Sequence, residues 1–95
     1  MNNSEQNTTT VYHISDIENT IVFCPHCRDP ILIEKMNCGI FRHASYISNH
    51  QPIDPHLSKE ACDRLVLNKE VYGCAKPFKI EKRDDYFELS ICGYI

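Results

Sequence analysis

Short runs of β-branched, aliphatic and aromatic residues recur along the chain and are separated by polar turns, a pattern typical of β-strands. Residues 20–23 (TIVF) and 31–36 (ILIEKM) form one pair of runs, and residues 40–44 (IFRHA) form a third strand. Further along, residues 78–80 and 87–91 carry apolar side chains at every second position. This alternation predicts an antiparallel hairpin with one apolar face, turned at residues 83–85.

One segment has helical spacing instead. Leu57, Ala61 and Leu65 share one face at intervals of four residues, and Ser58 is a favourable N-cap. We therefore expect a helix over residues 59–67. The predicted fold class is a small α+β domain stabilised by zinc, with zinc-ribbon-like β-hairpins and one short helix.

The polar start of the chain sets the expected domain boundary. After Met1, residues 2–10 contain no aromatic or branched aliphatic side chain, so they cannot bury enough apolar area to offset the entropy of ordering. We expect a flexible tail at residues 1–10 and a single domain at residues 11–95. A domain of this size has a marginal hydrophobic core and often needs a disulfide or a metal ion to stabilise it.

The chain has six cysteines and five histidines in 95 residues. It shows no secretory signal and no apolar stretch long enough to cross a bilayer, so we expect a cytoplasmic or nuclear location. Thiols stay reduced in such compartments, which favours metal ligands over disulfides. Because the number of cysteines is even, a disulfide framework remains the alternative.

The strongest metal signal is the pair Cys24 and Cys27 at the predicted tip of the first hairpin, where Pro25 restricts the turn. Two such cysteines supply half of a tetrahedral Zn²⁺ site. Cys74 lies on a turn, and Cys92 lies at the open end of the last hairpin. The sulfur atoms of both can therefore approach the same metal ion. The predicted zinc ligands are therefore Cys24, Cys27, Cys74 and Cys92. His26, between the first two, is expected to face solvent.

Two other arrangements remain open. His56 and Cys62 bracket the helix start and could replace the last two cysteines in a treble-clef-like site. Alternatively, a second metal site could form from Cys38, His43, His56 and Cys62. The ordinary alternative is that Cys62 is a small buried hydrophobe and His43 a hydrogen-bonded strand histidine.

Two resemblances bear on function. Residues 23–27 (FCPHC) resemble the active-site motif of DsbA-type thiol oxidoreductases, in which the first cysteine is a reactive nucleophile at a helix start. Here Pro30 and the β-prone residues 31–33 follow where that helix should continue.

Over a longer stretch the chain resembles small uncharacterised Cys/His-rich, zinc-finger-like proteins of large DNA viruses. The matching segments are residues 24–27, 37–43, 51–56, 59–63, 72–78 and 92–95. This resemblance implies a compact zinc-binding domain of viral origin, located in the cytoplasm or nucleus of a host cell or in a virion.

We expect a zinc-stabilised module that binds a protein or a nucleic acid, in viral transcription or translation. The formal charge of −3 argues against general attraction to nucleic acid. A local nucleic-acid or partner face remains an expectation, and its candidate residues are Arg42, Lys76, Lys79 and Arg83, with Phe41 and Tyr46.

The alternative is a structural protein for virion assembly. An enzyme is not expected, and no small-molecule substrate is evident. An HNH-like nuclease would use His43 as base, but residues 58–67 lack the required histidine.

Overall fold

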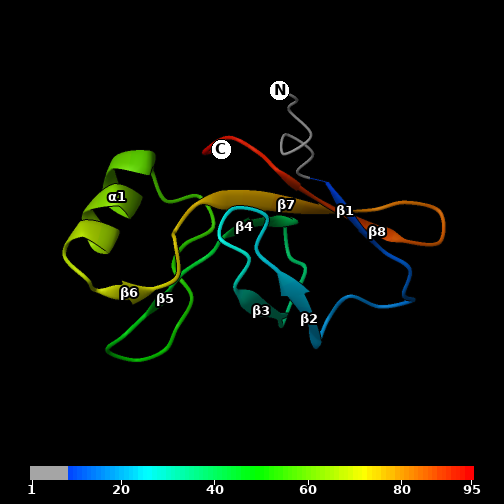
Figure 1. The fold of residues 1–95 in the computed structure, drawn as a ribbon, viewed down its shortest axis with the longest axis horizontal. Helices are drawn as coiled ribbons and strands as arrows, with labels where there is room; N and C mark the ends of the chain where they lie inside the picture. Colours follow the sequence, from blue (N-terminus) through cyan, green and yellow to red (C-terminus); the bar gives the residue numbers. More distant parts are fainter. Residues whose placement is uncertain (1–8) are drawn as a thin grey trace, which may run out of the picture.

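The computed structural model describes residues 9–95 as three antiparallel sheets and one helix (Figure 1). The elements are β1 (Thr10–Tyr12), β2 (Thr20–Phe23), β3 (Pro30–Ile33), β4 (Ile40–Arg42), β5 (Ser45–Tyr46), α1 (Lys59–Leu67), β6 (Val71–Tyr72), β7 (Pro77–Lys82) and β8 (Phe87–Ile91). The predicted class, a small α+β domain of antiparallel strands with one short helix, is confirmed. Within residues 9–95, no helix is long and apolar enough to cross a lipid bilayer.

The largest sheet has the strand order β1-β8-β7-β4. Its centre is the predicted hairpin of β7 and β8, in which Phe78 pairs with Ile91 and Lys82 with Phe87. Strand β1, which the sequence did not suggest, covers the edge of β8 and begins at Thr10, inside the segment expected to be a tail. The rest of that segment, residues 1–8, lies outside the described residues.

The β2–β3 hairpin packs one face on this sheet and forms the first hydrophobic core with it. Val22 and Ile33 are buried there together with Phe78 and Leu89. Since side chains alternate along a strand, the other face of the hairpin points outward. Ile21, paired directly with Leu32, lies on that outer face and is about half exposed.

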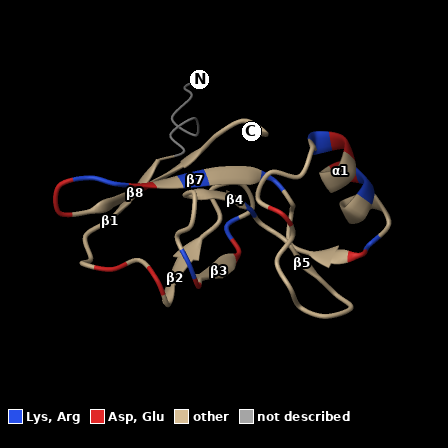
Figure 2. Cartoon of the chain, turned by 180° about the vertical axis from the view of Figure 1, so that it is seen from behind, with Lys and Arg blue, Asp and Glu red and all other residues tan. Residues whose placement is uncertain are grey.

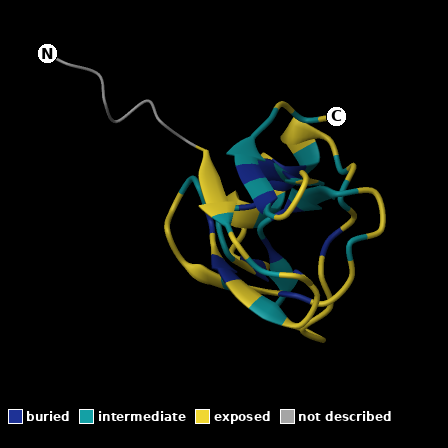
Figure 3. Ribbon diagram, turned by 90° about the vertical axis from the view of Figure 1, so that its right-hand side faces the viewer, coloured by how far each residue is buried: buried dark blue, intermediate teal, exposed yellow. Residues whose placement is uncertain are grey.

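The helix begins where the sequence predicts. The Ser58 side chain accepts a hydrogen bond from the Ala61 backbone N–H at 3.2 Å, which caps the first turn. The helix and the small β5–β6 sheet enclose a second core formed by Ala44, Ile53, Cys62, Val71 and Ala75. Figure 3 shows the buried segments in dark blue inside the fold and the exposed segments around them.

The pairing of β4 with β7 links the two cores. Phe41 pairs with Phe78, and their rings stack with centroids 5.1 Å apart. The pairing continues past the strand end, because the His43 N–H donates to the Lys76 carbonyl at 3.1 Å and the Ala75 N–H donates to the His43 carbonyl at 2.7 Å. Residue 43 is thereby held beside residues 74–76, between the two cores.

Candidate metal centre

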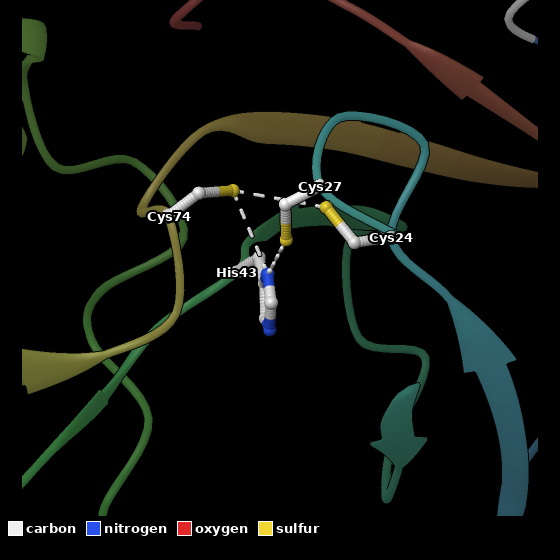
Figure 4. A group of neighbouring side chains, drawn as sticks. All are labelled: Cys24, Cys27, His43 and Cys74. Carbon is white, nitrogen blue, oxygen red and sulfur yellow. Dashed lines mark hydrogen bonds between the residues drawn. The ribbon is translucent and has the colours of Figure 1, made fainter. Parts of the chain in front are cut away.

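Four side chains from three separate segments converge between the two cores. Cys24 follows β2, Cys27 closes the hairpin tip, His43 follows β4, and Cys74 precedes β7. Figure 4 shows their sulfur atoms and the His43 ring directed toward a common point. Their ligand atoms all lie within 4.8 Å of one another.

Three of the six separations between ligand atoms match the edges of a zinc tetrahedron. With Zn–S bonds of about 2.3 Å and Zn–N bonds of about 2.0 Å, two sulfurs are about 3.8 Å apart and a sulfur and a nitrogen about 3.5 Å apart. Cys24 Sγ and Cys74 Sγ are 3.7 Å apart. His43 Nδ1 is 3.3 Å from Cys27 Sγ and 3.5 Å from Cys74 Sγ. All six cysteines are free thiols, so the structure contains no disulfide framework.

Backbone hydrogen bonds shape the hairpin tip that carries Cys24 and Cys27. The Cys24 N–H donates to the Asp29 carbonyl at 2.9 Å, and the Arg28 N–H donates back to the Cys24 carbonyl at 2.9 Å. Arg28 has φ 72°, a left-handed conformation that turns the chain back into β3. The tip therefore brings the sulfur atoms of Cys24 and Cys27 into the same cluster.

His26 has a structural role that the sequence did not suggest. It is half-buried rather than exposed, and its Nε2 lies 2.7 Å from the carbonyl oxygen of Pro77. The ring nitrogen donates this bond, since a carbonyl can only accept. His26 thus ties the hairpin tip to the first residue of β7. Its backbone N–H also points at Cys24 Sγ, at 3.4 Å.

The cluster stabilises negative charge on one of its three sulfur atoms, that of Cys24. The pKa of the Cys24 thiol is lowered to about 3, mainly because the Cys74 thiol donates a hydrogen bond to it, with further donation from His43 and from the backbone of Cys27 and His26, against an opposing effect of burial. The pKa of Cys74 is raised, because it is the donor to Cys24 and because it is buried. A divalent cation at the centre would replace these shared protons and hold the thiols as thiolates.

The fourth side chain of the cluster is His43 and not Cys92, which the sequence pattern predicted. Cys92 follows β8, and the β7–β8 register places it opposite Pro77. The chain before Pro77 does not continue along β8, because Gly73 (φ 98°) and Ala75 (φ 60°) turn it alongside the end of β4. Cys74 is therefore carried to His43 and away from the position next to Cys92.

The predicted second group is divided. His43 belongs to the first cluster, Cys38 and His56 lie together with Sγ and Nε2 3.4 Å apart, and Cys62 is buried in the second core. Cys62 Sγ contacts the Leu57 carbonyl oxygen at 3.8 Å. Among residues 9–95, the Cys24, Cys27, His43 and Cys74 cluster is the only group of three or more such side chains with metal-binding spacing. The treble-clef-like set of Cys24, Cys27, His56 and Cys62 is not assembled.

The four basic residues expected at a partner face do not form a continuous basic surface. Arg42 is only 5% exposed and donates to the carbonyl oxygens of Leu57 and Ile95 at 3.1 and 2.9 Å. Arg83 bonds the carboxylates of Glu81 and Glu88, both at 2.8 Å. The other two are Lys79, 3.8 Å from Glu81, and the exposed Lys76. In Figure 2, basic and acidic segments follow one another around the β7–β8 hairpin.

We predict that Gly73→Ala weakens the metal centre. Gly73 has φ 98°, and a Cβ there would overlap the backbone carbonyl of His43, so this loop must shift. We expect the zinc affinity to fall at least about tenfold and the melting temperature to drop by several degrees, since strain of this kind costs about 1–3 kcal/mol. Gly93→Ala is the matched control, because nothing lies within 4 Å of its added Cβ. Equal melts and affinities for both variants would contradict the prediction.

The comparisons with known proteins add no family to this description. No protein-family model matches the chain, and no curated protein or solved structure matches it either. The functional assignment therefore depends on the geometry of the cluster.

Proposed function

We propose that this chain is a zinc-stabilised binding module whose partner is a protein. The observation that carries the proposal is the convergence of Cys24, Cys27, His43 and Cys74, whose ligand atoms all lie within 4.8 Å of one another. Three thiolates and an imidazole are the donor set that Zn²⁺ prefers, and tetrahedral geometry suits its filled d shell.

Such a site has a structural role rather than a catalytic one. Its four protein ligands complete the coordination of the ion and leave no position for water or substrate. Of the two ligands on the hairpin, Cys24 is fully buried and Cys27 is exposed. Cys24 and Cys27 also lie in a β-hairpin and not at a helix start, which supports a metal-binding role over that of a thiol oxidoreductase.

The ion would join two cores that are each small. The first consists of seven buried residues and the second of five. Cys24 lies two residues after Val22 of the first core, whereas His43 and Cys74 immediately precede Ala44 and Ala75 of the second. Metal binding would therefore hold together two clusters that are marginal on their own.

Charge and exposure favour a protein partner over a nucleic acid. The formal charge is −3, and Zn²⁺ bound by three thiolates would add a further negative charge. The outer face of the β2–β3 hairpin is apolar and exposed, with Ile21, Phe23 and Leu32 at 51%, 53% and 49% exposure. Neighbouring exposed apolar side chains of this kind are typical of protein interaction sites.

The test compares zinc-loaded wild-type protein with the double variant Ile21→Ser/Leu32→Ser as bait in affinity capture. We expect a defined protein to be retained by the wild type at high salt and lost with the variant. Leu67→Ser is the matched control, since Leu67 is 79% exposed on the helix and should not affect binding. Salt-sensitive retention of DNA or RNA, unaffected by the double variant, would overturn the choice of partner.

The setting of this module stays a proposal from the sequence. The resemblance of residues 24–95 to Cys/His-rich proteins of large DNA viruses suggests a host cell or virion, with a role in viral transcription or translation. Virion assembly is the structural alternative, and it would use the same exposed apolar face.

A further inference from the structure

A second thiol–imidazole pair lies outside the cluster described above. Cys38 Sγ and His56 Nε2 are 3.4 Å apart. This separation falls between the two sulfur–nitrogen distances of the first cluster, 3.3 and 3.5 Å. It also matches the edge of about 3.5 Å that a shared zinc ion requires. The pair therefore has the spacing of two ligands of one ion.

His56 is oriented as a metal ligand. Its Nδ1 lies 2.8 Å from the Ile95 carbonyl oxygen, so Nδ1 carries the proton and donates it to that oxygen. Nε2 is then left unprotonated and faces the Cys38 sulfur. Metal-binding histidines almost always donate their second ring N–H in this manner, which fixes the ring and its tautomer.

The backbone at both residues is also constrained. The His56 N–H donates to Asp54 Oδ1 at 2.8 Å. Cys38 precedes Gly39, which has φ 77° and whose N–H donates to the Met36 carbonyl at 2.9 Å. The two side chains thus come from two tight turns. Both residues are exposed, in contrast to the buried Cys24 of the first cluster.

The two remaining thiols, Cys62 and Cys92, are poor candidates to complete this site. Cys62 is buried in the second core. Cys62 Sγ contacts the Leu57 carbonyl oxygen at 3.8 Å, and within residues 9–95 neither thiol joins Cys38 and His56 in a group with metal-binding spacing.

We propose that Cys38 Sγ and His56 Nε2 bind a second divalent ion of the zinc class, in an open site whose remaining coordination positions face solvent. An ion held by two protein ligands exchanges readily, and its open positions take water or a donor group from another molecule. This site is separate from the structural zinc and does not depend on the proposed partner.

The test is a zinc titration of the folded chain against a competing chelator of known affinity. We expect two ions per wild-type chain, the second bound at least about tenfold more weakly than the first. Cys38→Ser and His56→Asn should each bind one ion, with the tight affinity unchanged. Cys62→Ser and Cys92→Ser should still bind two ions.

A wild type that binds only one tight ion, or a Cys38→Ser variant that binds two ions, would overturn the second site and leave the structural zinc intact. Absence of the tight ion would instead refute the proposed function.

A labelling experiment covers the case in which a variant misfolds. With one zinc bound, wild-type Cys38 should react readily with iodoacetamide, and a second equivalent of Zn²⁺ should slow this reaction at least about tenfold. Cys92 is the internal control, and its labelling should not change. Equal rates at Cys38 with and without the second equivalent would contradict the proposal, and loss of the second ion in Cys62→Ser or Cys92→Ser would show a closed site instead of an open one.

Discussion

Removing the proposed structural zinc with a chelator, or replacing Cys24 with Ser, is expected to unfold the domain. Binding of a structural zinc is worth about 10–16 kcal/mol at neutral pH in small domains, whereas a whole domain is stable by only about 5–15 kcal/mol. The two small cores on either side of the site cannot supply the difference. Loss of the ion should therefore abolish cooperative folding and not merely lower the melting temperature.

Circular dichroism and thermal melts of the same preparation with and without zinc would measure this effect. Cys92→Ser is the matched control, because Cys92 is also partly buried but lies outside the cluster. We expect it to keep both its zinc and its cooperative melt. An unchanged melt for Cys24→Ser, or a melt that is insensitive to chelation, would show that the apolar cores suffice without metal.

The second large effect is expected at His43. His43→Ala should lower the affinity for the tight zinc at least about a hundredfold, equal to about 3 kcal/mol, since a ligand atom is lost from a closed tetrahedron. Cys92→Ser should bind as tightly as the wild type. The sequence pattern alone predicted the opposite result for Cys92, which makes this pair of variants the sharpest test of the geometry.

His43→Cys refines the same test. Its Sγ is closer to the backbone than Nδ1 is, but the Zn–S bond is longer than the Zn–N bond, so a thiolate at position 43 can still reach the ion. We expect this variant to recover most of the affinity lost in His43→Ala. Competition with a chelator gives the affinities, and the absorption spectrum of the Co²⁺ form reports the number of sulfur ligands. Tight binding by His43→Ala together with weak binding by Cys92→Ser would restore the all-cysteine site.

Elements whose signals are local in the chain could be predicted from the sequence. The helix over residues 59–67 begins at Ser58, as its capping preference indicates. The β7–β8 hairpin and the hairpin that carries Cys24 and Cys27 have the expected partners. Edge strand β1 and the short β5–β6 pair were missed. Strands this short have almost no pattern of their own, and they form because a neighbouring strand offers hydrogen bonds.

Part of the metal centre could also be predicted from local signals in the sequence. Two cysteines on a tight turn define their own spacing, so Cys24 and Cys27 were accessible from sequence, and Cys74 followed from its position on a turn. The other choices depended on contacts between distant segments. The β4–β7 pairing sets His43 beside Cys74, and the positive φ angles of Gly73 and Ala75 turn the chain away from Cys92. The Cys38 and His56 pair likewise depends on where two separate turns meet.

Residue type and spacing therefore specified the donors that the chain has and the hairpin that presents the first two of them. Which donors share an ion was decided by the tertiary structure, because a tetrahedron tolerates deviations of only a few tenths of an ångström at the ligands. Strand registers and backbone turns between remote segments set positions at that scale. A periodic pattern along the chain carries no information about them.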